Sequence, residues 1–189
     1  ASRGSITDRN GEPLAISTPM VSLWLHPETL LEDPARVAQL AQIMQLDANT
    51  LGARIAERRS REFMYLARHL PPDEAERVLA LKIPGVHGQR EYRRFYPGGE
   101  VFAHVLGVTD VDDAGQEGLE LAYNTQLVGH AGVKRVIKNR RGEIVENVEE
   151  VRAAEPGRTL TTTLDRRIQY LAYRELKAAM FEHSASSGS

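Results

Sequence analysis

Serine and lysine are the residues of this 189-residue chain whose types could support covalent chemistry, because the chain has no cysteine. A serine nucleophile needs a base within reach and donors that hold the oxyanion. In one serine acyltransferase arrangement a lysine follows the serine by three positions, and Ser-x-Asn and Lys-Thr/Ser-Gly motifs complete the site. The lysines neither follow a serine at that spacing nor precede Thr-Gly or Ser-Gly; they are Lys82, Lys134, Lys138 and Lys177. A Gly-x-Ser-x-Gly motif is also absent. We therefore predict no catalytic residue in this chain.

Metal and phosphate chemistry is weakly supported. The histidines lie far apart, with no pair at the helical spacing that a two-histidine metal site uses; they are His26, His69, His87, His104, His130 and His183. The acidic run at 110–113 lacks the spacing and the closing glutamate of a calcium loop, so a solvated turn is favoured over a cation site. The glycines at 129 and 132 flank a segment that resembles a turn more than a phosphate loop. We predict neither a metal nor a cofactor.

Charge limits the possible partners. The chain carries 24 Lys and Arg against 26 Asp and Glu, a formal net charge of -2, so no global field favours nucleic acid. Arg90, Arg93 and Arg94 alternate with aromatic residues, as in single-strand binders. Because the whole chain is not basic, a buried or interfacial arginine cluster is the favoured interpretation, and salt-sensitive nucleic-acid binding remains an alternative.

The N-terminal half is predicted to contain a hairpin and an inserted helical segment. Runs at 5–7 and 14–17 flank Asn10-Gly11, whose residues tolerate positive φ, so a hairpin is expected. A strand at 21–25 precedes two short helices that start at the capping residues Asp33 and Asp47. A strand at 63–67, a helix at 73–81 and a strand at 86–92 follow, so 27–83 reads as a mostly helical insertion between elements of a sheet.

The C-terminal half is predicted to consist largely of short elements that glycines separate. Short helices are expected at 100–106 and 116–126, and a second hairpin at 133–137 and 144–148 around a turn at 139–142. A β-branched strand at 159–163 precedes a helix that Asp165 caps, with an apolar stripe on one face. No run approaches the roughly 20 apolar residues that a membrane span needs. The polar end at 184–189 reads as a linker cut short, and we expect a removed segment before Ala1.

Three ordered motifs in this chain resemble those of the non-catalytic N-terminal module of class B penicillin-binding proteins, the membrane-anchored transpeptidases that cross-link peptidoglycan. The first motif spans 3–15, the second 93–107 and the third 115–132. The residues that carry the resemblance are Arg3, Gly4, Asp8, Gly11, Arg94, Tyr96, Pro97, His104, Gly107, Gly118 and Glu120. Segments at 156–165 and 168–169 resemble the entry to the transpeptidase domain of that family.

The resemblance implies an α+β fold: an elongated pedestal of β-hairpins and short helices, with a mostly helical inserted head and a C-terminal helix. It implies a pedestal at 1–163 with its head at about 27–83, a first helix of the transpeptidase domain at 164–183, and no catalytic domain in this chain. Without that domain, the last helix is expected to expose its apolar stripe and to swing out, swap or fray.

The resemblance also implies a biological setting. The parent protein would be a serine-type transpeptidase anchored by an upstream helix, with this module on the periplasmic face of the inner membrane. The length of the insertion and residues 111–118 resemble the septal, division-specific branch, and the elongation branch is the alternative; a free-standing hydrolase is less favoured. The expected partners are the catalytic domain, a glycan-polymerising glycosyltransferase, division regulators and, for some members, a second copy. The surface expected to contact them contains Arg54, Arg58, Arg59 and Arg61.

Glu120 is the residue whose surroundings can be predicted physically. It lies in an otherwise apolar run, where a buried carboxylate requires a cationic partner. Arg3 and Arg94 are the candidates, so we predict that Glu120 joins the first motif to the third through one of these arginines.

Overall fold

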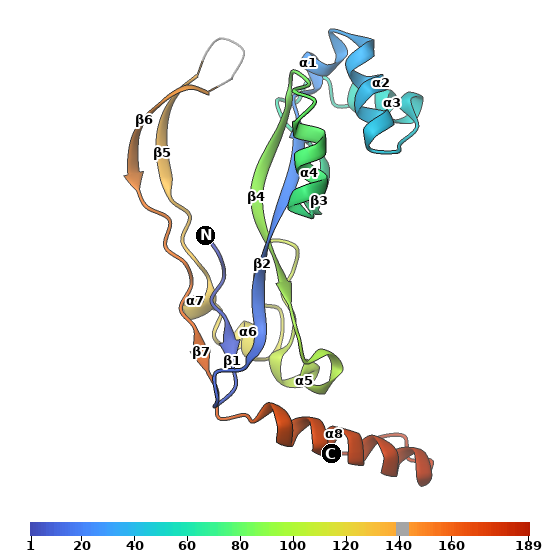
Figure 1. Cartoon of the computed structure of the whole chain (residues 1–189), viewed down its shortest axis with the longest axis vertical. Coiled ribbons are helices and arrows are strands. Elements are labelled where there is room, and N and C mark those ends of the chain that lie inside the picture. The colour runs from blue at the N-terminus through green and yellow to red at the C-terminus, as the bar shows by residue number, and fades with distance from the viewer. Residues whose placement is uncertain (139–143) are drawn as a thin grey trace. The chain divides into compact units, whose positions relative to one another are not determined.

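The computed structural model describes residues 1–138 and 144–189, and the side chains of residues 138–150 are not described. The chain forms two compact units (Figure 1). Unit 1 contains Ala1–Thr18 and Arg94–Ser189, and unit 2 contains Pro19–Arg93. Two long strands, β2 (Pro13–Leu25) and β4 (Val86–Phe95), each contribute residues to both units. Helix and strand are mixed throughout, so the predicted α+β class is confirmed.

Unit 1 is built from short elements apart from its last helix. Besides the first part of β2, it contains β1 (Ile6–Thr7), the 3₁₀ helix η1 (Gly99–Val101), α5 (Ala103–Leu106), α6 (Gly118–Ala122), α7 (Asn124–Leu127), β5 (Val133–Lys138), β6 (Ile144–Arg152), β7 (Leu160–Thr161) and α8 (Arg166–Glu182).

The predicted N-terminal hairpin is confirmed. β1 pairs antiparallel with β2, with Ile6 opposite Ala15. Gly11 has a φ of 84°, the left-handed conformation that glycine adopts without a steric penalty. Asp8 Oδ1 accepts hydrogen bonds from the backbone amides of Asn10 and Glu12, which closes the turn. On its other side β1 pairs in parallel with β7, so two segments far apart in the sequence are neighbours in one sheet.

The core of unit 1 is small and comes from distant parts of the sequence. Its buried side chains are Ile6, Leu14, Ala15, Phe102, Leu106 and Leu127. Burying a large aliphatic or aromatic side chain stabilises a fold by about 1.5–3 kcal/mol. The core therefore holds β1, β2, α5 and α7 together.

The predicted second hairpin is also present, as a two-stranded antiparallel ribbon of β5 and β6. Its predicted turn, at 139–142, lies outside the described residues. The side chains of β5 are largely exposed; Val133 is 48% exposed and Ile137 is 51% exposed. The ribbon therefore has little apolar cover within the described residues.

The predicted helices at 100–106 and 116–126 are shorter and more broken than expected, because the backbone is packed against itself at their glycines. The first region is η1 followed by α5, and the second is α6 followed by α7. A Cβ on Gly107 would lie 2.1 Å from the carbonyl oxygen of Glu117, and Gly107 has a φ of 71°. This close approach ends α5 and brings it against α6.

Unit 2 contains the predicted helical insertion and three strand segments. Besides the parts of β2 and β4, its elements are α1 (Pro27–Leu31), α2 (Pro34–Ile43), α3 (Ala48–Ala56), β3 (Met64–Leu70) and α4 (Pro72–Leu79). The predicted caps are confirmed: Asp33 accepts from the amide of Ala35, and Asp47 accepts from the amide of Thr50. β2 pairs with β3 and with β4. One continuous core, which includes Leu23, Leu30, Leu40 and Ile55, lies between these strands and the helices.

The C-terminal helix α8 begins as predicted, with Asp165 Oδ1 accepting hydrogen bonds from the amides of Arg167 and Ile168. Helical structure is continuous to Glu182. That the helix swings out, swaps or frays without the catalytic domain stays a prediction. The exposure of its apolar stripe is confirmed: none of the side chains of α8, all of which are described, is buried. Within the described residues, no helix is both long and apolar enough to cross a membrane.

Candidate functional site: the Glu120 cluster

Arg3, Arg94 and Glu120 form a buried ionic cluster, which we call the Glu120 cluster. Arg3 Nε donates to Glu120 Oε2 at 2.7 Å, and Arg94 Nε donates to Glu120 Oε1 at 2.7 Å. The side chains of the three residues are at most 2% exposed. The predicted pairing of Glu120 is therefore confirmed, with both candidate arginines instead of one.

Three other guanidinium nitrogens of the cluster, Nη1 and Nη2 of Arg3 and Nη1 of Arg94, also donate hydrogen bonds. Arg3 Nη1 donates to the carbonyl oxygen of Asp113 at 2.9 Å and to Asn124 Oδ1 at 2.8 Å, and Arg3 Nη2 donates to the carbonyl oxygen of Glu120 at 2.8 Å. Arg94 Nη1 donates to Ser17 Oγ at 3.1 Å. The cluster thus ties together the N-terminus, β2, the end of β4, the loop before α6, and α7.

The stability of this cluster depends on the charges of all three of its residues. Two guanidinium groups share one carboxylate, and burying a charge without its partner costs several kcal/mol. Both oxygens of Glu120 are occupied by charge-assisted hydrogen bonds. The Glu120 carboxylate is fully buried, and the arrangement holds segments of unit 1 together.

Tyr96 follows Arg94 by two residues in the sequence, and the charge of Glu120 acts on its hydroxyl group. Burial, followed by the negative charge of Glu120, raises the pKa of the Tyr96 hydroxyl. Within the described part of the chain, Tyr96 Oη and Arg94 Nη2 are buried without a hydrogen-bond partner. His104, from the same sequence motif, is exposed on α5, so the structure does not bring it to the cluster.

The glycines of the motifs permit close backbone approach around the cluster. A Cβ on Gly4 would lie 2.0 Å from the carbonyl oxygen of Arg158, and a Cβ on Gly118 would lie 2.6 Å from the carbonyl oxygen of Val105. Gly4 donates its amide proton to the carbonyl oxygen of Leu127 at 2.8 Å. Glycine at these positions is therefore required by the packing of segments from all three motifs.

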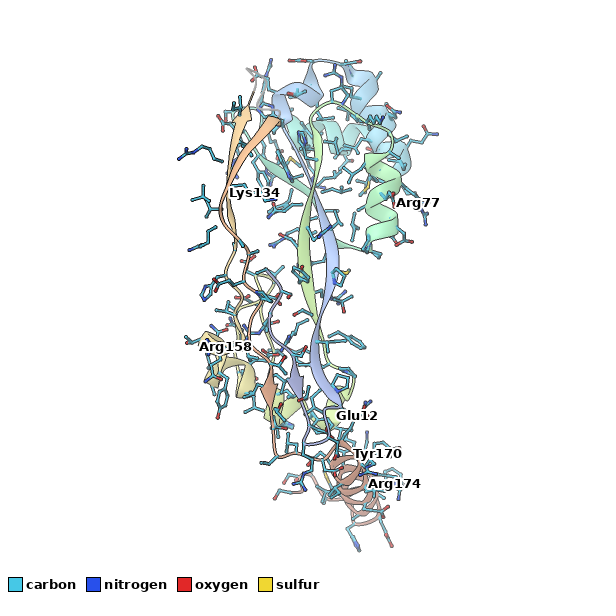
Figure 2. The ribbon with its side chains drawn as sticks, turned by 60° about the vertical axis from the view of Figure 1, so that its left-hand side comes forward. Glu12, Arg77, Lys134, Arg158, Tyr170 and Arg174 are labelled. Atoms are coloured by element: carbon cyan, nitrogen blue, oxygen red, sulfur yellow. The ribbon has the colours of Figure 1, made fainter. Side chains whose placement is uncertain are left out.

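A second feature of unit 1 is a cavity of about 730 Å³ at the start of α8. Its lining includes Asp8 and Glu12 from the first motif, Pro97 from the second, and Arg166 and Tyr170 from α8. Figure 2 shows Glu12 beside the start of α8, with Tyr170 further along this helix. Arg166 lies 3.6 Å from Glu12 in an exposed ion pair. The cavity places the first motif, the second motif and the helix around one hollow.

Unit 2 contains a polar cluster that sequence reasoning missed. Glu91 on β4 accepts hydrogen bonds from Ser22 on β2 and from Arg68 on β3, and His69 Nε2 lies 3.3 Å from Glu91 Oε2. Burial opposes the ionisation of Glu91, but these hydrogen bonds and charges outweigh it and hold the pKa of Glu91 below its usual range. Glu91 lies between two arginines in the sequence, and this charge pattern was the available signal for an ion pair.

The other predicted residues lie apart from both clusters. Of the arginines expected to cluster at 90–94, Arg94 alone is buried, and Arg90 and Arg93 are exposed. Arg93 faces the side opposite to Arg94, because adjacent residues of a strand point to opposite faces. In the acidic run, Asp110 Oδ1 accepts from the amides of Asp112 and Ala114, as a turn requires.

The arginines expected to contact partners lie at the end of α3 and in the segment after it. Arg54, Arg59 and Arg61 are exposed, and Arg58 is half-buried. A cleft of about 540 Å³ in unit 2 includes Arg59 and Arg61 in its lining, together with Glu28, Glu57, Glu62 and His26. The surface is therefore of mixed charge instead of uniformly basic.

Comparison with known proteins identifies relatives along the whole chain. A probable peptidoglycan D,D-transpeptidase, PbpC of Pseudomonas aeruginosa, is 40% identical over 187 residues, which are 99% of this chain and 33% of that protein. The peptidoglycan D,D-transpeptidase FtsI of Escherichia coli K12 is 39% identical over 193 residues, covering 100% of this chain and 33% of that protein. The chain thus spans about a third of the length of these curated relatives.

Among solved structures, the penicillin-binding protein PBP2 in its complex with MreC from Helicobacter pylori has the same fold. It matches with a TM-score of 0.68 and 23% sequence identity, over 94% of this chain and 37% of that one. Residues 1–162 match the family described as the penicillin-binding protein dimerisation domain. This match and the motif residues that meet around Glu120 show that the chain belongs to the penicillin-binding protein dimerisation domain family.

Proposed function

We propose that this chain is the non-catalytic pedestal and interaction module of a septal peptidoglycan D,D-transpeptidase. The observation that carries the proposal is the match of residues 1–162 to the dimerisation domain family, together with relatives named as D,D-transpeptidases that are about three times as long. The Glu120 cluster supports a structural role, because its hydrogen bonds hold segments from distant parts of the sequence together. In this proposal the bond-forming serine belongs to a catalytic domain that the parent protein carries in addition.

The proposed location is the periplasmic face of the inner membrane, with the parent protein anchored by a helix upstream of Ala1. Cross-linking of peptidoglycan takes place outside the cytoplasm, so a supporting module must be on that side of the membrane. Testing this location needs the parent protein, fused at its C-terminus to a reporter that is active only after export.

A labelled β-lactam tests the division of labour. We expect the parent protein to become covalently labelled on a serine of its catalytic domain, and this chain alone to remain unlabelled. Ser22, which hydrogen-bonds Glu91, supplies the control variant Ser22→Ala. Labelling of the isolated chain that disappears in this variant would place a nucleophile in the module and contradict the proposal.

Chimeras test the septal assignment against the elongation alternative. This chain replaces the equivalent third of Escherichia coli FtsI in one chimera, and the corresponding region of an elongation transpeptidase in a second. We expect the first chimera to localise at the division site and to support division. If only the second chimera is functional, the module belongs to the elongation branch.

The partner surface is proposed to be the cleft in unit 2 and the arginines beside it. Its lining of arginines and glutamates suits a protein segment that carries both signs of charge. The relative PBP2 was solved in complex with a protein, MreC, which supports a protein partner for this fold.

Charge reversal tests this surface. The double variant Arg59→Glu/Arg61→Glu is expected to weaken binding to the division partners at least tenfold and to slow association more at low salt than at high salt. The matched control is Arg77→Glu on α4, an exposed arginine that does not line the cleft; Figure 2 shows Arg77 on the outside of this helix. Equal loss of binding in both variants would place the contact elsewhere.

A further inference from the structure

The turn of the first hairpin binds the segment that leads into α8. The amide of Arg9 donates to the carbonyl oxygen of Leu164 at 2.8 Å. The side chain of Arg9 donates twice to the carbonyl oxygen of Thr163, from Nε at 3.0 Å and from Nη2 at 2.7 Å. The amide of Arg166, in the first turn of α8, donates to Asp8 Oδ2 at 3.0 Å. We call these contacts the turn clamp.

The turn clamp uses groups that the hairpin itself does not require. Asp8 Oδ1 closes the hairpin turn by accepting from Asn10 and Glu12, whereas Asp8 Oδ2 is directed to α8. The guanidinium of Arg9 makes no hydrogen bond to β1 or β2 in the described structure and instead reaches across to Thr163. The contacts are thus specific to the junction between β7 and α8.

Other contacts hold α8 weakly. Its side chains are not buried, and beyond the first turn Lys177 forms an exposed ion pair with Glu100 of η1 at 2.9 Å. Exposed ion pairs contribute little to stability and are screened by salt. The first turn of α8 is therefore the place where its direction is determined.

We propose that the turn clamp sets the direction in which α8 leaves unit 1. This inference rests on the proposed function in one respect: because α8 would lead into the catalytic domain, Asp8 and Arg9 would be positioning residues for that domain. The carboxylate of Asp8 and the guanidinium of Arg9 would thereby link the base of the pedestal to the orientation of the transpeptidase.

The variant Asp8→Asn tests the clamp with minimal change to the hairpin. The asparagine oxygen can still accept from the amides of Asn10 and Glu12, which leaves its NH₂ group facing the amide proton of Arg166, donor against donor. Arg9→Ala removes the two bonds to Thr163. The control is Arg167→Ala, because the side chain of Arg167 is 83% exposed and its Nε lies 3.8 Å from Asp165 Oδ1.

The readout is a distance distribution between two spin labels in unit 1. Because the chain has no cysteine, Thr125→Cys on α7 and Ala178→Cys on α8 give two specific labelling sites, both at exposed positions. We expect one narrow distribution in the parent chain and in Arg167→Ala, and at least a doubling of its width in Asp8→Asn and Arg9→Ala. Unchanged widths in both clamp variants, with labels attached, would overturn the proposal.

The same variants in the parent protein separate this inference from the proposed function. We expect Arg9→Ala to leave the rate of β-lactam labelling within twofold and to lower peptidoglycan cross-linking at least fivefold, with Arg9→Lys restoring part of it. If the unaltered parent protein takes no β-lactam label, the proposed function fails while the spin-label result still stands. If Arg9→Ala cross-links normally, the clamp has no positioning role for the catalytic domain.

Discussion

Glu120 is the carboxylate that two buried guanidinium groups share in unit 1, and its neutralisation is expected to be costly. Glu120→Gln keeps the shape of the side chain but leaves Arg3 and Arg94 without a counter-charge, which lowers the free energy of unfolding by about 3–5 kcal/mol. Urea unfolding followed by circular dichroism measures this change. Tryptophan fluorescence is unsuitable, since Trp24 belongs to unit 2.

The control for this variant is Glu175→Gln. Glu175 pairs with Arg174, which Figure 2 shows on α8, and both side chains are more than half exposed. Exposed pairs of this kind contribute about 0–1 kcal/mol. A loss in Glu120→Gln no larger than that in the control would show that the buried charges find other compensation.

The lowered pKa of Glu91 predicts that the stability of unit 2 depends on pH. Its pKa in the folded state is lowered, so it contributes stability at pH values above its unfolded value, about 4.3. As the pH falls through the lower folded value, the carboxylate is protonated in both states and that contribution is lost. We expect Glu91→Gln to flatten the acid limb of the stability curve, measured by urea titrations of Trp24 fluorescence between pH 7 and 3. Glu76→Gln, an exposed change on α4, is expected to leave that limb unchanged.

The Glu120 pairing was predictable at this scale, whereas the Glu91 cluster was not. An acid in an apolar run must find a cation if it is buried, and that rule names its partners from sequence alone. Glu91 lies in a polar strand, and its position between Arg90 and Arg93 does not indicate that its side chain is largely buried. Its partners Ser22 and Arg68 come from two other strands, and their register with β4 is set by tertiary packing.

At the scale of elements, Gly107 shows how backbone contact sets helix length. In Gly107→Ala the alanine would have to adopt a left-handed φ of 71°, and its Cβ would lie 2.1 Å from the carbonyl oxygen of Glu117. Gly99 also has a positive φ, 53°, but nothing lies within 4 Å of its Cβ position. We expect Gly99→Ala to lower the free energy of unfolding by about 1 kcal/mol through strain, and Gly107→Ala by about 3 kcal/mol or more. Equal losses in urea unfolding would contradict the role of the close contact.

The β5–β6 ribbon predicts a local difference in stability. Two-stranded ribbons without apolar cover have marginal stability, and the side chains of β5 in this ribbon are largely exposed. We expect the amides of β5 to exchange with deuterium at least a hundred times faster than those of β1 and its paired part of β2. Comparable protection in the isolated chain would show that the ribbon has cover that these contacts do not include.

Local elements and the two hairpins were predicted well, whereas pairings between distant segments were not. Asp33, Asp47 and Asp165 each cap a helix, and Gly11 adopts the left-handed turn, because these effects act between residues a few positions apart. The helices of 100–126 were predicted too long, since the contact of Gly107 with Glu117 depends on tertiary structure. The parallel pairing of β1 with β7 joins segments far apart in the sequence, and no local sequence pattern indicates it.

At the scale of the whole molecule, the two units have separate cores. The buried clusters of unit 1 and unit 2 share no residue. Leu40→Ala, which empties a fully buried site in unit 2, is expected to destabilise that unit by about 2–5 kcal/mol. We expect faster amide exchange throughout unit 2 and unchanged protection around Phe102 and Leu106 in unit 1. Uniform acceleration in both units would show that they unfold as one.

The order of the chain also determines when each unit can form during synthesis on the ribosome. Unit 2 is one uninterrupted stretch, Pro19–Arg93, so all its core residues are synthesised before the part of unit 1 that starts at Arg94. Unit 1 begins at Ala1 but lacks Glu120, Leu127 and β7 until much later. Arg3, the first residue of the ionic cluster to be translated, must therefore stay in water until its carboxylate partner leaves the exit tunnel.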